Sequence, residues 1–264
     1  MTAQNKPQQF LAGLAMAGQV AMTSPLPHSP SAQTVLDEKS RQVAKEIGET
    51  EHQEIMAKLN TYVNSPAGHL ERETELYLEQ QLSEILGFKV RAELEGQRLN
   101  HSIGIMGAEQ HLIRFPGDTL IQHDAYREAG IAPNRGAFGW FTENGELTEA
   151  SVMREKYYFA AQLMYLPDWS IKHPELKPWY KFRKMIVINP AEQLAVVGVV
   201  ADAGPAMWVK KQFGGSPEVI REGKIWSPAS KGKVMLLFVD DEANQIPLGP
   251  IDLDFVKISA HDQN

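Results

Sequence analysis

The sequence predicts an α+β protein, with a helical N-terminal region and a β-rich C-terminal half. Apolar residues recur at multiples of four between about residues 34 and 63, which is the spacing of one helix face. The segments 184–188, 195–201 and 233–239 are continuous runs of β-branched and other apolar residues, after an initial lysine in the first and third, and such runs are typical of strands buried on both faces. A chain of 264 residues is long enough for one large domain, with or without an N-terminal extension.

The composition excludes several classes of function. The chain has no cysteine, which rules out disulfides, thiolate metal sites, iron–sulfur clusters and a cysteine nucleophile. Its 26 basic and 33 acidic residues give a net charge of -7, so we expect no nucleic-acid partner. No apolar run reaches about 18 residues, and we expect no membrane-spanning segment. No glycine-rich phosphate loop is present either, and no cofactor is predicted.

Residues 1–33 are predicted to be a flexible tail or a weak signal segment. An apolar stretch at 10–17 follows Lys6, and its end, Ala15-Met16-Ala17, fits the small-residue pattern of a signal-peptide cleavage site. Glycines interrupt the stretch, and three prolines follow it. Both alternatives stay open at this point, and the signal segment would direct the protein to the cell envelope or outside the cell.

Residues 34–87 are predicted to form a helical hairpin. The first helix carries apolar residues on one face: Val43, Ile47, Ile55, Leu59 and Val63. A Ser-Pro-Ala-Gly segment at 65–68 ends it, and a second helix is expected from about His69 to Leu86, with Gly87 as its C-terminal cap. Residues 88–137 are expected to form an irregular α/β segment packed on a β domain at 138–264.

The most informative motif is a carboxylate at the end of an apolar strand. The run at 195–201 ends in Asp202, and Gly204-Pro205 follows. A carboxyl group partly removed from water retains its proton more readily, which suits a general acid near neutral pH. An aspartate that accepts backbone N–H bonds in a turn just past the strand is the alternative, and spacing alone favours it.

The order of the motifs around Asp202 resembles that of the six-stranded double-psi β-barrel, and most closely rare lipoprotein A and the expansins. The resemblance covers roughly residues 138–239. It rests on a strand with an Asn-Pro turn, a strand ending in Asp-x-Gly-Pro, a Gly-Ser-Pro-Glu-Val helix start and a final strand after Lys-Gly: 186–190, 195–205, 214–219 and 231–239. Asp202-Ala203-Gly204-Pro205-Ala206 is also similar to the Asp-x-Gly-x-Ala of membrane-bound lytic transglycosylase A.

This resemblance implies contact with a long β-linked glycan, either peptidoglycan or cellulose-like, in a shallow groove with the strand-end aspartate as acid. Asp202 is the matching position, and Glu146 is the second candidate, because Thr142 to Glu146 matches a Thr-x-x-Gly-Glu element of the family. Two positions depart from the pattern: Gln162 replaces a histidine, and Gly215 precedes Ser216 where the family has aspartate. The predicted substrate-binding residues are Trp140, Gln162, Gly204, Trp208, Gly215 and Ser216.

Three hypotheses on function stay open for such a barrel, and the first is cleavage of a glycan. Hydrolysis usually needs two carboxylates, whereas lytic transglycosylation needs only one acid/base, because the 6-hydroxyl of the sugar attacks the anomeric carbon. Lyase-type cleavage by Asp202 is therefore preferred to hydrolysis. A non-catalytic, expansin-like module that binds carbohydrate or loosens the wall is the second hypothesis. An interaction or structural protein is the third, since one fold hosts many functions.

Histidines at 101, 111 and 123 lie among carboxylates, a combination that can bind a metal ion. Ten or more residues separate them, and no His-Glu-x-x-His motif is present. We therefore expect separately packed or hydrogen-bonded histidines and no metal site. The segment around them is expected to form a lid or groove wall against the barrel.

Overall fold

The computed structural model describes residues 32–123, 129–226 and 231–254. The chain divides into two compact units, residues 1–44 and residues 45–264, and the second unit contains all the strands. Residues 1–31, on which the predictions of a tail or signal segment fall, lie outside the described residues. None of the described helices is both long enough and apolar enough to cross a bilayer.

Helices and strands alternate irregularly along the chain. The α-helices are α1 (Ala32–Val63), α2 (Arg72–Leu86), α3 (Glu149–Lys156), α4 (His173–Tyr180) and α5 (Pro217–Glu222). Single 3₁₀ turns are η1 (Leu120–Gln122), η2 (Leu163–Tyr165) and η3 (Met207–Val209). The strands are β1 (Val90–Arg91), β2 (Glu93–Leu94), β3 (Gln97–Arg98), β4 (Ile103–Ala108), β5 (Tyr158–Ala161), β6 (Lys184–Asn189), β7 (Leu194–Asp202), β8 (Phe213–Gly215), β9 (Lys231–Val239) and β10 (Gly249–Asp252).

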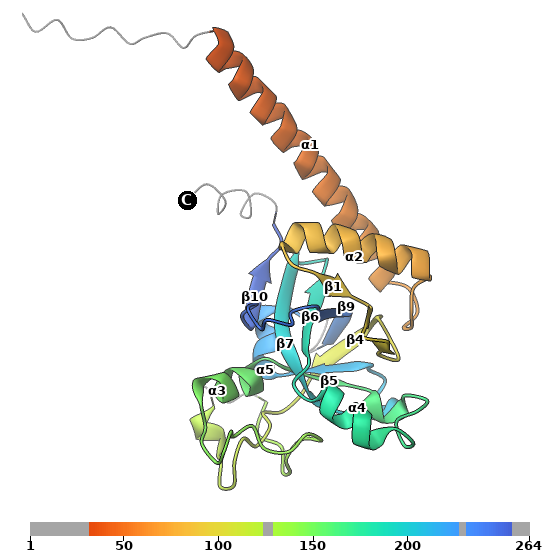
Figure 1. Cartoon of the computed structure of the whole chain (residues 1–264), viewed down its shortest axis with the longest axis vertical. Coiled ribbons are helices and arrows are strands. Elements are labelled where there is room, and N and C mark those ends of the chain that lie inside the picture. The colour runs from red at the N-terminus through yellow and green to blue at the C-terminus, as the bar shows by residue number, and fades with distance from the viewer. Residues whose placement is uncertain (1–31, 124–128, 227–230, 255–264) are drawn as a thin grey trace, which may run out of the picture. The chain divides into compact units, whose positions relative to one another are not determined.

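Six of these strands close into a mixed β-barrel (Figure 1). Going round the ring, β4 pairs with β8, β8 with β5, β5 with β7, β7 with β6, β6 with β9, and β9 with β4. The β4–β8 and β5–β7 pairs are parallel and the other four are antiparallel. β1 and β10 extend the sheet beside β9 and β7. The predicted α+β fold with a six-stranded β-barrel is confirmed.

The long strands have continuous apolar sequences because the protein has a buried cluster on each side of them. All six barrel strands contribute to one buried cluster, which therefore lies inside the ring and includes Met106, Phe159, Val187, Val196, Phe213 and Leu236. The alternate residues of β6, β7 and β9 join a second cluster, outside the ring, with Leu59 of α1 and Leu78 and Leu82 of α2. Because successive side chains of a strand point to opposite faces, these strands are buried on both faces, as predicted.

The helix predictions from residue 45 onward agree with the structure. Ile55, Leu59 and Val63 are buried on one face of α1, and α2 ends at Leu86. Gly87 caps α2 with a φ of 73°, a left-handed conformation that favours glycine. Since residues 1–44 form a unit of their own, the hairpin arrangement of the whole helical region stays a prediction.

The first barrel strand, β4, comes from the segment expected to be irregular, before residue 138. Its sequence is short and contains Gly104 and Gly107, which weakens the strand pattern. Both glycines have a packing reason. A Cβ atom on Gly104 would lie 2.9 Å from Cβ of Gln212, and one on Gly107 would lie 2.8 Å from Cδ of Lys211. The chain after η3 therefore packs closely over β4.

Candidate functional site

Asp202 is the last residue of β7 and is partly exposed. Its Oδ1 atom accepts a hydrogen bond from the backbone N–H of Ala137, at 2.8 Å. The donor is 65 residues away in the chain, so this bond ties a distant segment to the barrel end. The other carboxyl oxygen of Asp202, Oδ2, lies near Gly204: a Cβ atom built on Gly204 would be 3.6 Å from it.

Asp202 begins a row of small residues that runs across four strands. Ala160 on β5 is its register partner, Gly214 on β8 pairs with Ala160, and Gly107 on β4 pairs with Gly214. Residues paired across a sheet share one face. The chain neighbours of this row, including Met106, Phe159, Ala161 and Phe213, belong to the interior cluster. The row therefore lies on the outer face of the barrel.

An ion pair covers the far end of this row. Lys211 Nζ lies 2.8 Å from Oε1 of Glu109 and donates to the carbonyl oxygen of Ala108 at 3.0 Å. The Glu109 carboxyl lies over Gly214, where a Cβ atom would come within 2.7 Å of Cδ of Glu109. Two strand spacings separate Gly214 from Asp202, about 9.5 Å between Cα atoms. The outer face thus carries two carboxylates, Asp202 at one end of the row and Glu109 over Gly214.

Tyr158 is the first residue of β5, the strand between β7 and β8. Its hydroxyl donates to the carbonyl oxygen of Gln110, and its side chain is buried. Burial, followed by the negative charges of Glu109, Glu155 and Asp202, raises the pKa of Tyr158 well above its ordinary value. The phenol therefore stays neutral and anchors the segment after β4, on which Glu109 is carried.

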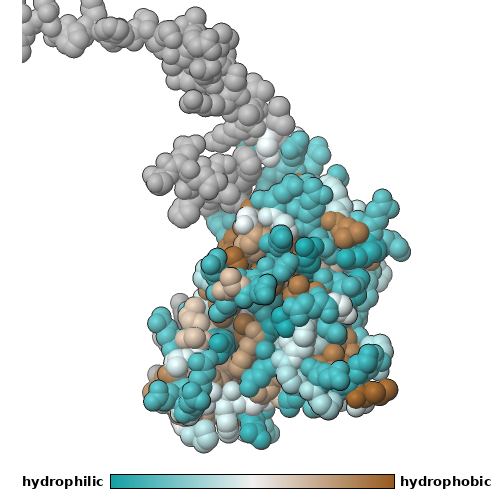
Figure 2. Space-filling model, viewed as in Figure 1, coloured by the Kyte–Doolittle hydropathy of each residue, from teal (hydrophilic) through white to brown (hydrophobic). Residues whose placement is uncertain are grey.

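An exposed apolar turn follows Asp202. In η3, Met207, Trp208 and Val209 are 64%, 80% and 45% exposed. The backbone N–H of Met207 donates to the hydroxyl of Tyr165 at 3.4 Å, which joins η3 to η2. On the face of the molecule in Figure 2, hydrophilic residues cover most of the surface and hydrophobic ones show in small, separate patches. An exposed tryptophan on such a surface suggests a contact site, since indole combines a large apolar face with a polar edge.

Three of the other predicted site residues are buried and make structural contacts. Gln162 is 7% exposed, and its side-chain amide donates to the carbonyl oxygen of Lys211 at 3.2 Å. Gly215 faces inward, where a Cβ atom would lie 2.8 Å from Cγ1 of Val219. Ser216 caps α5: its hydroxyl accepts from the N–H of Val219 at 3.2 Å and donates to the carbonyl oxygen of Lys156 at 2.6 Å. Their proposed roles in substrate binding stay predictions.

Glu146 and Trp140 lie on the segment before α3. Glu146 is exposed in a tight turn, where its backbone pairs with that of Glu143. The guanidinium of Arg135 lies 5.4 Å from the centre of the Trp140 ring. The contacts described for these two residues are made within this segment, so their roles beside Asp202 also stay predictions.

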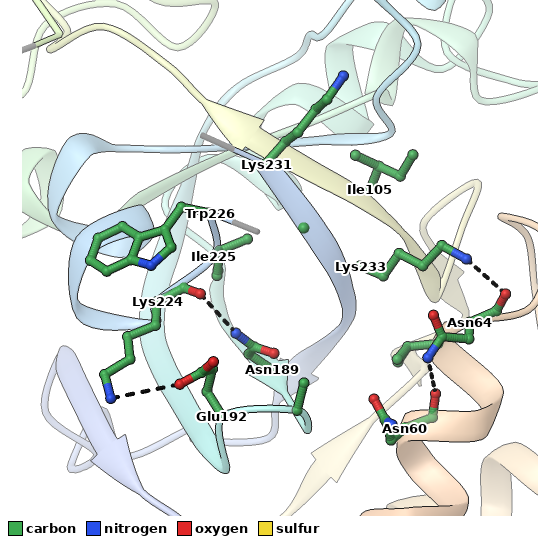
Figure 3. Close-up of a pocket in the computed structure, with 13 residues that line it drawn as sticks. Asn60, Asn64, Ile105, Asn189, Glu192, Lys224, Ile225, Trp226, Lys231 and Lys233 are labelled. Atoms are coloured by element: carbon green, nitrogen blue, oxygen red, sulfur yellow. Dashed lines mark hydrogen bonds and ion pairs between the residues drawn. The ribbon is translucent and has the colours of Figure 1, made fainter. Parts of the chain in front are cut away.

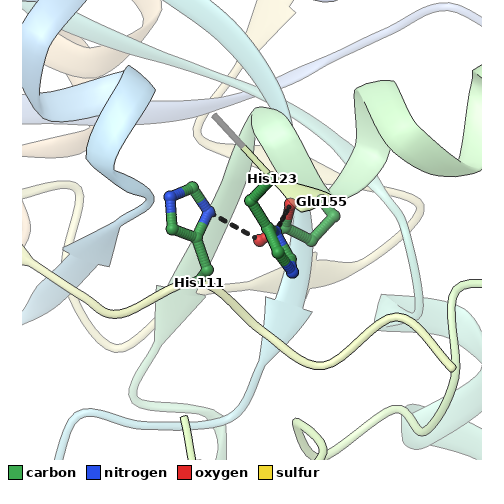
Figure 4. A group of neighbouring side chains, drawn as sticks. All are labelled: His111, His123 and Glu155. Atoms are coloured by element: carbon green, nitrogen blue, oxygen red, sulfur yellow. Dashed lines mark hydrogen bonds and ion pairs between the residues drawn. The ribbon is translucent and has the colours of Figure 1, made fainter. Parts of the chain in front are cut away.

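The histidine segment forms a buried cluster that combines two of the three predicted histidines with a glutamate (Figure 4). His111 Nδ1 lies 3.2 Å from Glu155 Oε1, and His123 Nδ1 lies 2.9 Å from Glu155 Oε2. These side chains are at most 3% exposed. The third histidine, His101, lies elsewhere, edge-on to Phe213.

A second carboxylate orients this cluster. His123 Nε2 lies 3.0 Å from Asp118 Oδ2, and the Arg114 guanidinium donates to both oxygens of Asp118 at 2.8 and 2.9 Å. Burial opposes ionisation of Asp118, but the Arg114 hydrogen bonds and the charge of His123 outweigh it and lower the pKa of Asp118. Burial likewise opposes ionisation of Glu155, while hydrogen bonds from His111 and His123 lower the pKa of Glu155. Both acids are therefore ionised at neutral pH.

Neither Glu109 nor Glu155 is predicted from the sequence as a member of these two groups. Glu109 and Lys211 meet because β4 and β8 pair in parallel, which no local spacing reveals. Glu155 lies on α3, 32 residues after His123. A signal for the histidine cluster was present in part, since Arg114, Asp118 and His123 are close in sequence.

A separate pocket of about 400 Å³ opens beside β9 (Figure 3). It is lined by polar, basic and aromatic side chains, including Asn64, Asn189, Lys224, Trp226 and Lys233. Lys224 Nζ lies 3.6 Å from Glu192 Oε2, and Lys233 Nζ donates to the carbonyl oxygen of Asn64 at 2.8 Å. None of the predicted site residues is among the described residues that line this pocket.

Comparisons with known proteins add no relative. No model of a protein family, no curated protein and no solved structure matches this chain.

Proposed function

We propose that this protein binds a β-linked glycan of the cell wall at the Asp202 end of its barrel, and that Asp202 is the general acid/base of a lytic cleavage. The observation that carries this proposal is the exposed Trp208, placed six residues after a carboxylate at the end of a barrel strand. Sugar rings stack on flat apolar faces such as that of the Trp208 indole. A single carboxylic acid, here Asp202, is sufficient to protonate a glycosidic oxygen.

The strand order supports a barrel of the double-psi type. Exchanging β4, β5 and β6 with β7, β8 and β9 reproduces every neighbour pair of the ring together with its direction. The barrel therefore consists of two topologically equivalent halves. This internal symmetry supports the resemblance to rare lipoprotein A and the expansins, from which the glycan substrate is inferred.

The proposed reaction needs no water. Protonated Asp202 gives its proton to the glycosidic oxygen as the C1–O4 bond breaks, and that oxygen leaves as a free 4-hydroxyl. The 6-hydroxyl of the same sugar attacks C1 and gives its proton to the Asp202 carboxylate, which restores the acid. The products are a chain with a 1,6-anhydro end and a chain with a free 4-hydroxyl.

Glu109 is the second carboxylate that the outer face offers. Its side chain lies over Gly214, which is two strands away from Asp202 on the same face of the barrel. Its ion pair with Lys211 holds the carboxyl group in place, which suits a base or a stabiliser of developing positive charge. Hydrolysis would therefore use Asp202 and Glu109 together and would release reducing ends without anhydro-sugar.

A non-catalytic, expansin-like module is the alternative that one observation favours. Gln162 occupies the place of the family histidine and is engaged with the backbone of Lys211. An amide in this position offers no proton-transfer group, so binding without cleavage is the outcome expected if that histidine is essential to the family reaction.

One experiment separates these activities. The purified protein is incubated with peptidoglycan sacculi and with cellulose, and bound protein and released sugars are measured by pull-down and mass spectrometry. Release of anhydro-ended fragments supports lytic cleavage, and binding without release supports the expansin-like module. The Asp202→Asn variant should bind but release at least a hundredfold less, whereas Glu242→Gln, which alters an exposed acid in the loop after β9, should behave like wild type. Absence of binding to both polymers would refute the glycan proposal.

A further inference from the structure

We propose that His111, His123 and Glu155 bind a divalent transition-metal ion, with Zn²⁺ as the best fit, in a buried site whose fourth position would be filled by a water molecule. The donor set consists of two imidazoles and one carboxylate, a combination that zinc uses in proteins. The three ligands come from three separate segments of the chain: an isolated bridge at His111, the end of η1 at His123, and α3 at Glu155. Their donor atoms nevertheless lie within 4.8 Å of one another.

The spacing of the donors is close to what a tetrahedral ion requires. With metal–ligand distances of about 2.0–2.1 Å, two donors of one tetrahedral ion are about 3.3 Å apart. The Glu155 oxygens lie 3.2 Å from His111 Nδ1 and 2.9 Å from His123 Nδ1. These distances are to different oxygens, Oε1 and Oε2, and one ligand atom of each residue lies within 4.8 Å of the others. Binding one ion therefore requires side-chain rotations that bring both nitrogens and one of these oxygens to about 2.0–2.1 Å from it. Figure 4 shows the carboxylate of Glu155 directed at both imidazoles.

The surroundings of these donors resemble the outer shell of a metal site. A metal-bound histidine usually gives its other ring N–H to a carboxylate, which fixes its orientation. His123 directs Nε2 at Asp118, and Arg114 holds Asp118 through its guanidinium. The Glu155 carboxylate in turn accepts the backbone N–H of Leu112 at 3.0 Å. Hydrogen bonds with Asp118 and with the backbone of Leu112 thus fix the orientation of two of the proposed ligands, His123 and Glu155.

The site would stabilise the segment that contacts Asp202. The backbone of His111 pairs with this segment through Gly130 and Ala132, at 3.0 and 2.8 Å, and Ala137 donates to Asp202 farther along. Because the ligands are at most 3% exposed, a bound ion would have little access to solvent, and its role is to join the segment to α3. This inference does not depend on the glycan substrate.

The test is metal binding by the full-length protein. The protein is stripped with a chelator at neutral pH, reloaded with Zn²⁺ or Co²⁺, and examined by elemental analysis, Co²⁺ visible absorption and thermal unfolding. We expect about one ion per chain, a tetrahedral Co²⁺ spectrum and a raised Tm with metal. Glu155→Gln should abolish all three effects, and Asp118→Asn should weaken binding by about 10–100-fold. His101→Gln, a histidine outside the cluster, should bind like wild type.

Two results would overturn the proposal. The first is a wild-type protein that takes up no more metal than Glu155→Gln and shows no change in Tm on addition of Zn²⁺. The second is equal metal loading of wild type and Glu155→Gln with the same Co²⁺ spectrum. The wild-type titration decides the question by itself if the Glu155 variant does not fold.

Discussion

The geometry of the barrel can be tested by making one substitution, glycine to alanine, on the two strands that flank β5. A Cβ atom on Gly198 of β7 would lie 2.7 Å from the ring of Phe159 and closer still to the carbonyl oxygen of Tyr157. A Cβ atom on Gly214 of β8 would lie 2.5 Å from Cγ and 2.7 Å from Cδ of Glu109, and closer still to its Oε1. The first obstacle is fixed backbone and a core ring, whereas the second is one flexible, partly exposed side chain.

Gly198→Ala and Gly214→Ala should therefore differ in how much they lower the free energy of unfolding. Alanine at 198 cannot be accommodated without moving the parallel β5–β7 pair, and such overpacking costs about 1–3 kcal/mol. Alanine at 214 displaces Glu109 from Lys211, a partly exposed ion pair worth at most about 1 kcal/mol. The reduced freedom of the unfolded chain returns about 0.4–1 kcal/mol in both variants. Gly198→Ala should therefore lose up to about 2.6 kcal/mol, and Gly214→Ala should unfold within about 0.5 kcal/mol of wild type.

Urea unfolding, followed by tryptophan fluorescence and far-UV circular dichroism, measures both free energies. Gly68→Ala is the matched control, because nothing lies within 4 Å of a Cβ atom at that position. An equal, large loss in Gly198→Ala and Gly214→Ala would refute the outward orientation of the row from Asp202 to Gly107. So would a Gly198→Ala variant as stable as the control.

Two further outcomes are expected. Burial opposes ionisation of Asp241, but hydrogen bonds from Lys184 and two backbone N–H groups outweigh it and lower the pKa of Asp241. The stabilisation is therefore complete above the ordinary value of 3.8 and is lost as the pH falls through the lowered pKa. Lys184→Met should cost most at neutral pH and less near pH 3, and a pH-independent loss in urea unfolding would contradict this. Trp208→Ala should leave stability within about 0.5 kcal/mol, because the side chain is 80% exposed, and should weaken glycan pull-down about tenfold. Trp226→Ala, in the pocket beside β9, should bind normally; equal losses in the two variants would argue against a platform at Trp208.

Local sequence predicts β6, β7 and β9 because each is buried on both faces and so consists of an uninterrupted apolar run. The other three barrel strands lack this signal. β4 and β8 contain glycines that make room for side chains from elsewhere, and β5 has four residues. Only the pairing of distant segments makes these short sequences strands, and that pairing cannot be seen in a local window.

The same limit applies to the candidate sites: residues in one continuous motif can be predicted, and residues brought together from distant segments cannot. Asp202 is predictable because a strand-end acid followed by Gly-Pro is a continuous motif. Its partners are not, since Glu109 comes from the end of β4 and Lys211 from the chain before β8. The structure places His111 and His123 within hydrogen-bonding distance of Glu155. Their convergence on one carboxylate depends on α3, which sequence spacing does not place beside them.

The most direct test of the proposed function is the time course of anhydro-ended fragments released from sacculi by wild type and by Asp202→Asn at equal bound protein. Wild type should release fragments steadily, and the variant should release them at least a hundredfold more slowly with unchanged binding. Equal release by the two proteins would contradict the assignment of Asp202 as the proton donor.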